Sequence, residues 1–240
     1  MKYLYRTYQL LVALPILLLL TAVVAIVTIV GCAIGKASFW SYWPARCWSR
    51  AMCTMLLLKV EVKGRENIRP DVSYVFTPNH QGAFDIFLVY GYLGTPFRWM
   101  MKKSLRTIPL VGKACESAGH IFVDKSGPKA MAQTMRQARD VLRGGISLVA
   151  FPEGERTLTG KMGAFRRGPF SLASEVGLDV VPVVIEGSYD VLPRQKGFYF
   201  VNFHTLRMNI LPPISHEGET EETLRQTAYS RISSCLSACS

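Results

Sequence analysis

Residues 10–35 form one uncharged, almost wholly apolar run, and this run limits what the chain can fold into more than any other feature. A helix of about 20 apolar residues crosses the hydrocarbon core of a bilayer, so the run is long enough to span a membrane or to lie deeply within it. A cleaved signal peptide is the alternative, but the apolar stretch is too long and no small-x-small cleavage site follows it. We expect a membrane helix with an early kink at Pro15.

A second element near the membrane follows at residues 39–50. Three tryptophans stand here among Tyr42, Arg46 and Arg50, a mixture typical of the interface between lipid and water. A helix is predicted to begin near Pro44 and to continue to residue 58. We therefore predict an anchor of two helices over residues 1–60, the first deep in the membrane and the second nearer its surface. Whether the first helix crosses completely stays open.

The charge balance favours a lipid surface as a partner. The formal net charge is +11, and no acidic residue precedes Glu61 although several lysines and arginines do. A basic, apolar N-terminus suits anionic lipid headgroups. Nucleic acid would also suit the charge, but no zinc-finger, RRM or basic-helix pattern is present, so we expect no nucleic-acid partner. The six cysteines form no C-x-x-C pair and no zinc-like spacing with histidine, so we expect no metal site.

From residue 61 to residue 240 the pattern changes to alternating strands and helices. Short apolar runs at residues 72–77, 147–150 and 179–188 predict buried strands, and residues 128–143 predict a helix. Residues 198–214 predict a hairpin, and a closing helix follows it. We therefore predict an α/β domain with a mixed, largely parallel central sheet flanked by helices.

The stretch VFTPNHQGAFDIF, which begins at Val75, places a histidine and a carboxylate in an apolar neighbourhood. His80 and Asp85 would not share a face of one helix, but they can meet if His80 lies in a turn after a strand and Asp85 begins the next helix. Asn79 and Gly82 suit such a turn. The carboxylate would fix the imidazole tautomer, and the other ring nitrogen could take a proton from a hydroxyl. The alternative is a helix-capping Asp beside an unrelated loop histidine.

A second polar cluster, FPEGERT at residues 151–157, also follows a buried strand. It places Glu153, Gly154 and Arg156 at the carboxyl end of that strand, the edge at which open α/β sheets bind ligands. Backbone N–H groups near Gly154 and the forked guanidinium of Arg156 could hold a phosphate. A charged surface turn would explain this loop equally well on its own.

Two further blocks complete an ordered set. NHQGAFD, GHIFVDK, FPEGERT and VPVVIEG follow one another along the chain, and together they resemble the four motif blocks of the glycerolipid acyltransferases, specifically the 1-acylglycerol-3-phosphate acyltransferases. The resemblance covers about residues 60–215, and a two-helix anchor also fits this family. It implies that His80 is the catalytic base and Asp85 its partner. It also implies that the phosphorylated acceptor is bound by Lys125, Glu153, Gly154 and Arg156.

Three positions depart from the family pattern. Gly82 stands where a serine is frequent, so a hydroxyl role is absent there. Glu155 stands where threonine is usual, which adds a negative charge beside the expected phosphate site. Lys125 stands for an arginine and keeps the charge without the bidentate fork. Arg166 and Arg167 are additional candidates for phosphate or headgroup contacts, with a solvated basic turn as the alternative.

The other histidines receive no catalytic role. His120 precedes an apolar strand and is interpreted as a structural residue, and no function is assigned to His204 or His216. No serine or cysteine stands beside a recognisable base, so we expect no covalent acyl-enzyme.

The resemblance implies an O-acyltransferase that moves a fatty acyl group from a thioester, acyl-CoA or acyl-ACP, to the 2-hydroxyl of 1-acylglycerol 3-phosphate. The product would be phosphatidate, in phospholipid biosynthesis. The acyl donor would be a co-substrate, with no other cofactor, and the partners would be membrane lipids, lysophosphatidate, and CoA or acyl carrier protein. We expect association with the inner or cell membrane and an active site on the cytoplasmic side. Two alternatives stay open: an acyltransferase for glycerol 3-phosphate or a lyso-aminolipid, and a non-catalytic lipid-binding protein.

Overall fold

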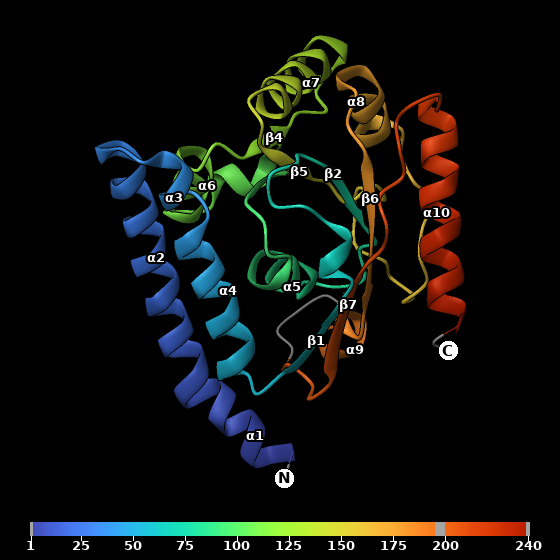
Figure 1. Ribbon diagram of the computed structural model, residues 1–240. Coiled ribbons are helices and arrows are strands. Elements are labelled where there is room, and N and C mark those ends of the chain that lie inside the picture. The colour runs from blue at the N-terminus through green and yellow to red at the C-terminus, as the bar shows by residue number, and fades with distance from the viewer. Residues whose placement is uncertain (1, 195–199, 239–240) are drawn as a thin grey trace.

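A seven-stranded sheet forms the centre of the computed structural model, which describes residues 2–194 and 200–238 (Figure 1). The strands lie in the order β1-β7-β6-β2-β5-β3-β4. Every neighbouring pair is parallel except β6 with β7, which is antiparallel. The predicted mixed, largely parallel sheet is therefore confirmed. The strands are β1 (Lys59–Lys63), β2 (Val75–Pro78), β3 (Phe97–Lys102), β4 (Ile121–Val123), β5 (Ser147–Val149), β6 (Val180–Glu186) and β7 (Thr205–Ile210).

Helices cover both faces of the sheet, which explains why the central strands β2 and β5 are buried along their whole length. In Figure 1, α4 and α5 lie on one side of the sheet with α2 outside them, and α7, α8 and α10 lie on the other side. Each side has its own apolar core. The helices of the α/β domain are α5 (Asp85–Tyr92), α6 (Val111–Ser117), α7 (Pro128–Arg143), α8 (Gly168–Val176), α9 (Ser188–Val191) and α10 (Glu221–Ala238).

The N-terminal helix is continuous from α1 (Lys2–Tyr8) through the π-helical turn η1 (Gln9–Ala13) to α2 (Leu14–Ile34). Pro15 lies in the first turn of α2. The proline nitrogen cannot donate a hydrogen bond, and the ring crowds the preceding turn. Pro15 therefore accounts for the wider π-helical turn, close to where the sequence predicted a kink. Of the described helices, Lys2–Ile34 is long and apolar enough to cross a membrane, and only a small share of its apolar window is buried in the protein. This exposed apolar helix indicates membrane association.

The second helix of the predicted anchor is present as α4 (Trp43–Met55), but it is too short and too polar to cross a bilayer. A helix of this length extends about 20 Å, against a hydrocarbon core of about 30 Å. It lies between α2 and α5. Trp48 donates its indole N–H to Thr21 Oγ1 at 2.9 Å, and Arg50 donates from Nε to the Gly91 carbonyl at 2.9 Å. The structure corrects the predicted pair: one apolar helix could span a membrane, and α4 fastens it to the α/β domain.

The predicted hairpin at residues 198–214 is wrong in its pairing. Residues 198 and 199 lie outside the described residues. Of the rest, Thr205–Ile210 form β7, which pairs with β6 on one side and with β1 on the other. β1, with its alternating KVEVK, was not among the predicted strands. Because β1 comes from far earlier in the chain, the local pattern around β7 carried no sign of this partner.

Candidate active site

His80 lies in the turn that follows β2, at the carboxyl edge of the central sheet. Asn79 fastens this end of β2 to the neighbouring strand β6. Its amide donates to the Ile185 carbonyl at 2.9 Å, and its side-chain oxygen accepts the Ile185 N–H at 2.7 Å. Asn79 is buried, so these two bonds fix the point at which His80 leaves the sheet. The sequence indicated a turn residue here, and the structure shows a link between strands.

The structure brings His80 and Asp85 together across this turn. Nδ1 of His80 is 2.7 Å from Oδ2 of Asp85, which is the first residue of α5. The same oxygen accepts the Gly82 N–H at 2.9 Å, and the Asp85 side chain is wholly buried. Because an ionised carboxylate only accepts hydrogen bonds, Nδ1 carries the ring proton and Nε2 is the basic nitrogen.

Stacking sets the plane of the His80 ring. The imidazole lies on the ring of Phe151 with the centroids 3.7 Å apart and the planes 9° from parallel. Phe151 in turn lies on Trp99, with the centroids 5.4 Å apart. Neither aromatic residue was expected to have a role. The one signal for Phe151 was its place at the start of the FPEGERT block, and Trp99 in β3 had none.

Glu153 is buried, and its carboxylate faces two backbone N–H groups. Oε1 accepts the N–H of His80 at 2.7 Å, and Oε2 accepts the N–H of Gly163 at 2.7 Å. Burial raises the pKa of this carboxyl. Both oxygens are thus engaged by the protein, and Glu153 holds the His80 turn against the loop that follows β5. A contact between Glu153 and the acceptor stays a prediction.

The loop between β5 and α8 has no regular secondary structure, and Gly154 makes its first turn possible. Gly154 has a φ of +79°, and a Cβ there would lie 2.8 Å from Nε of Arg166. That Nε donates to the Glu153 carbonyl at 3.1 Å. The N–H of Gly154 donates to the Phe151 carbonyl at 3.0 Å, so this group serves the turn and is not free for a phosphate. The role of Gly154 in this structure is conformational.

Two of the candidate phosphate ligands, Arg156 and Arg166, belong to this loop, whereas Lys125 lies between β4 and α7. The Arg194 guanidinium, through its hydrogen bond, lowers the pKa of the exposed Glu155 carboxyl most strongly. The charges of Arg166 and Lys125 lower it further. Among the described residues, the charged ends of Lys125 and Arg156 have no hydrogen-bond or ion-pair partner. Cations without an ion-pair partner can bind an anionic group such as phosphate through charge-assisted hydrogen bonds. No motif block included Arg194.

Arg167 lies apart from these groups. Its side chain is 73% exposed, and its Nη1 is 3.8 Å from the Glu221 carboxylate at the start of α10. The structure does not bring Arg167 to the His80 turn, and its predicted contact with a phosphate or headgroup has no support from this position.

Gly82 packs closely against Ser188, the first residue of α9. A Cβ at Gly82 would lie 2.5 Å from both the carbonyl oxygen and Oγ of Ser188, which is buried. The serine that is frequent at this position would therefore displace α9, and the chain accommodates the close approach with glycine.

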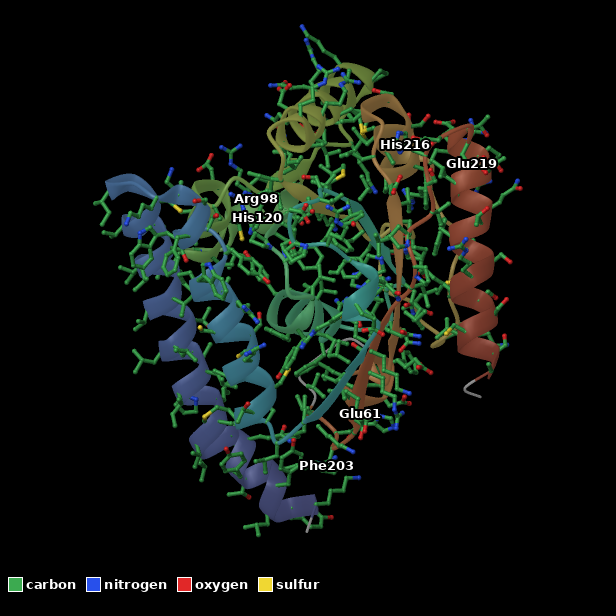
Figure 2. The ribbon with its side chains drawn as sticks, in the orientation of Figure 1. Glu61, Arg98, His120, Phe203, His216 and Glu219 are labelled. Carbon is green, nitrogen blue, oxygen red and sulfur yellow. The ribbon has the colours of Figure 1, made fainter. Side chains whose placement is uncertain are left out.

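His120 is buried away from the dyad, as its interpretation as a structural residue requires. Nδ1 accepts the N–H of Trp99 at 3.2 Å, and Nε2 is 3.1 Å from Oη of Tyr90. The Tyr90 hydroxyl lies 3.1 Å from the carbonyl of Ser41, to which it donates. Burial, and then the charge of the neighbouring Arg98 (Figure 2), lower the pKa of His120 to about 3. With both nitrogens engaged, this neutral histidine holds the segment before α4 to the sheet.

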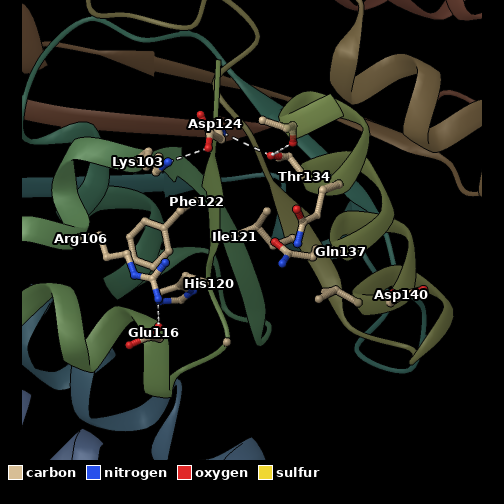
Figure 3. A pocket seen from close by; sticks show the side chains of 14 residues that line it. Lys103, Arg106, Glu116, His120, Ile121, Phe122, Asp124, Thr134, Gln137 and Asp140 are labelled. Atoms are coloured by element: carbon tan, nitrogen blue, oxygen red, sulfur yellow. Dashed lines mark hydrogen bonds and ion pairs between the residues drawn. The ribbon is translucent and has the colours of Figure 1, made fainter. Parts of the chain in front are cut away.

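A pocket of about 510 Å³ lies at the sheet edge, among β4, α6 and α7, and the dyad is not in its walls (Figure 3). Of its charged side chains, all but Asp140 are paired with one another. Lys103 contacts Asp124 at 2.6 Å, and Arg106 pairs with Glu116. The hydrogen bond from Lys103, followed by those from Ser126, lowers the pKa of the Asp124 carboxyl to about 2. We assign this pocket no part in the chemistry.

The described cysteines are free thiols. Burial raises the pKa of Cys115 to about 11, so its thiolate is disfavoured. Within residues 2–194 and 200–238, no group of three or more His, Cys, Asp or Glu side chains could hold a metal ion.

Comparisons with known proteins show what the chain is similar to. Residues 59–186 match the model of the Acyltransferase family. The chain is 32% identical over 181 residues to a 1-acyl-sn-glycerol-3-phosphate acyltransferase of Chlamydomonas reinhardtii, which covers 72% of this chain and 53% of that protein. It is 31% identical over 198 residues to the 1-acyl-sn-glycerol-3-phosphate acyltransferase of Saccharomyces cerevisiae, which covers 81% and 64%. The chain spans about half the length of the first curated relatives it matches.

The fold also matches that of a solved protein. The crystal structure of the 1-acyl-sn-glycerophosphate acyltransferase PlsC from Thermotoga maritima aligns with a TM-score of 0.77 over 93% of this chain and 95% of that one, at 24% identity. The matched family region covers more than half of the chain and contains the His80 turn and the FPEGERT loop. The chain therefore belongs to the acyltransferase family.

Proposed function

We propose that the protein transfers a fatty acyl group from an acyl thioester to the 2-hydroxyl of 1-acylglycerol 3-phosphate, which gives phosphatidate. The observation that carries this proposal is the 2.7 Å contact between His80 Nδ1 and the buried Asp85 carboxylate, because it leaves Nε2 as a base. The curated relatives named above are 1-acyl-sn-glycerol-3-phosphate acyltransferases, which supports this choice of acceptor.

In the proposed reaction the acceptor hydroxyl is the nucleophile. Nε2 of His80 takes the hydroxyl proton as the oxygen attacks the thioester carbonyl, a C–O bond forms and the C–S bond breaks. The imidazolium then gives the proton to the departing thiolate. Asp85 stabilises the imidazolium, and the stack on Phe151 keeps the ring aligned. A thioester is already activated, so we propose that no cofactor besides the acyl donor takes part.

The cations around the FPEGERT loop are proposed to bind the acceptor phosphate. The charged ends of Arg156 and Lys125 have no hydrogen-bond or ion-pair partner among the described residues, and the charges of Lys125 and Arg166 both act on Glu155. Guanidinium and ammonium groups bind phosphate through charge-assisted hydrogen bonds.

The exposed apolar helix Lys2–Ile34 supports a reaction at the membrane. Both the lysolipid and the acyl chain partition into the bilayer, whereas CoA and acyl carrier protein are water-soluble and anionic. The basic balance of the chain would attract either donor. We propose that the site opens at the cytoplasmic surface, where these donors are found.

The test uses the full chain purified in detergent, with acyl-CoA and acyl-ACP offered in turn. The acceptors are 1-acylglycerol 3-phosphate, glycerol 3-phosphate and a lyso-aminolipid. We expect rapid acylation of 1-acylglycerol 3-phosphate and slow acylation of the other two. A preference for another acceptor would reject the proposed substrate, and no transfer to any acceptor would reject the enzyme.

The proposed mechanism also excludes a covalent intermediate. We expect no protein-bound label after the enzyme is incubated with labelled acyl thioester alone and quenched in denaturant. Stoichiometric label that passes to added lysophosphatidate would instead require a Ser or Cys nucleophile.

A further inference from the structure

Arg194 follows α9 in the chain, lies outside every motif block and contacts the loop expected to bind the acceptor. Its Nη1 donates to Oε2 of Glu155 at 3.0 Å and to the backbone carbonyl of Arg156 at 2.7 Å. One nitrogen therefore bridges a carboxylate and a carbonyl of adjacent residues. The Arg194 side chain is 33% exposed, so it is partly packed against the loop and is not a freely solvated cation.

The outer part of the loop is held by the segment around α9. The Tyr189 hydroxyl donates to the Leu158 carbonyl at 3.2 Å, and Arg194 holds the Arg156 carbonyl. The inner part of the loop is held by Glu153. Since the loop has no helix or strand of its own, these bonds decide its backbone path. A fixed carbonyl at Arg156 restricts the rotation next to its Cα and so the direction of its side chain.

The contact between Arg194 and Glu155 also reduces the repulsion between the Glu155 carboxylate and a phosphate. Glu155 carries a negative charge among Arg194, Arg166 and Lys125, and an unpaired carboxylate there would repel a phosphate. Arg194 neutralises Glu155 through the ion pair. Arg194 thus favours phosphate binding in two ways, and Glu155 opposes it.

We propose that Arg194 is a positioning residue for the phosphate of the acceptor, acting through Arg156 and against the charge of Glu155. This inference rests on the proposed function and adds to it a residue from outside the motif blocks and a direction of effect for each member of the ion pair. An ion pair with only a structural role would make both single variants worse. A pair that tunes phosphate binding makes them act in opposite directions.

The experiment measures KM for lysophosphatidate and for the acyl donor in R194M, R194K and E155Q. We expect R194M to raise the acceptor KM about 3- to 10-fold, because a hydrogen bond and a neutralising charge are lost together. R194K keeps a charged donor and should fall between R194M and the wild type. E155Q removes the repelling charge and should lower the acceptor KM about twofold. The donor KM and Tm should stay close to those of the wild type in all three.

The matched control is R207M. Arg207 also pairs with a glutamate at 3.0 Å, but its partner Glu61 is on β1, and the pair joins β1 to β7. This variant should leave both KM values unchanged.

An unchanged acceptor KM in R194M would overturn the inference, as would a rise in the acceptor KM in E155Q. If R194M does not fold, R194K and E155Q carry the test, since opposite shifts in their acceptor KM are still required. A wild-type protein without activity on lysophosphatidate would reject the proposed function itself, a result distinct from these.

Discussion

The molecule contains two histidine–aspartate pairs of nearly equal length at opposite edges of its sheet. His80 Nδ1 is 2.7 Å from Asp85 Oδ2, and His216 Nδ1 is 2.8 Å from Asp179 Oδ1. Asp85 begins the helix after β2, whereas Asp179 directly precedes β6, which runs parallel to β2. One pair therefore lies at the carboxyl edge, where parallel sheets bind ligands, and the other at the amino edge. Figure 2 labels His216 of the second pair.

The surroundings of the two pairs differ far more than their lengths. The side chains of Asp85 and His80 are 0% and 13% exposed, whereas Asp179 and His216 are each 33% exposed. The His80 ring also stacks on Phe151, and the His80 carbonyl accepts at 3.0 Å the N–H of Thr157, which follows Arg156 in the FPEGERT loop. A histidine–aspartate contact by itself is therefore no sign of catalysis. Burial, ring orientation and a binding site for the acceptor make the difference.

The largest expected effect separates the two histidines. His80→Ala should lower kcat/KM by about 10²- to 10⁴-fold, because general-base catalysis contributes that much. His216→Ala should leave the rate within about twofold of the wild type, since its pair is remote from the cations. Steady-state assays of both folded variants decide this. Similar losses of kcat/KM in His80→Ala and His216→Ala would mean that the two pairs do not differ in function.

The two aspartates extend the same comparison. Asp85→Asn keeps the shape but no longer stabilises the imidazolium, so its loss should approach that of His80→Ala without exceeding it. Asp179→Asn is the matched control and should have little effect on rate. If Asp85→Asn has wild-type kcat over the accessible pH range, Asp85 does not orient the base.

His120 tests how burial changes the pKa of a histidine that has no carboxylate partner. The pKa of His120 is lowered to about 3, below its unfolded value of about 6.5, so the unfolded state binds the proton more tightly. As the pH is lowered from ~6.5 to ~3, this group alone should therefore lower the free energy of unfolding by about 1.4 kcal/mol per pH unit. Denaturant unfolding of the wild type and His120→Gln in detergent should show a stability difference that shrinks as the pH falls. A difference that is constant with pH would contradict the assignment.

Removal of the Arg156 side chain is expected to have a smaller effect, confined to acceptor binding. Arg156→Ala should raise the acceptor KM about tenfold or more, since loss of a charge-assisted hydrogen bond costs about 1.5–3 kcal/mol. The donor KM should change little. Arg231 of α10, which donates to the Pro212 carbonyl, is the control arginine. Its removal should change neither the acceptor KM nor the donor KM. An acceptor KM that is unchanged in Arg156→Ala would make the loop structural only.

The smallest expected effect concerns how each histidine backbone is held. The N–H of His216 is bound at 3.1 Å by its own partner, Asp179, whereas the N–H of His80 is bound by a third residue, Glu153. Glu153→Gln has one acceptor oxygen for two N–H donors, so the free energy of unfolding should fall by about 1–3 kcal/mol. The kcat should fall with it as the His80 turn shifts. Thermal unfolding and activity of the variant measure both, and an unchanged kcat would limit Glu153 to stability.

Local patterns along the chain were sufficient for several features. The apolar run at residues 10–35 required a long helix, and the apolar runs followed by loops required buried strands with polar carboxyl ends. The turn between His80 and Asp85 could be predicted because both residues belong to one strand–turn–helix unit, whose geometry depends on a few neighbouring residues. Such features need only local sequence, since helical period, strand burial and turn residues act over a few positions.

Other features needed the folded chain. The stack of Phe151 and Trp99 under His80 joins residues from three separate parts of the chain, and Arg194 contacts Arg156 of the FPEGERT loop from 38 positions away. The pairing of β7 with β1 replaced the expected hairpin for the same reason.

The sequence by itself thus determined the long apolar helix, the class of fold, the family and the two residues of the dyad. Only the tertiary structure decided which of two similar pairs is buried at the carboxyl edge of the sheet, that Glu153 faces backbone N–H groups, and that α4 packs against the domain. These depend on contacts between distant segments, which hydrophobic burial selects over the whole molecule at once and which no short stretch of sequence encodes.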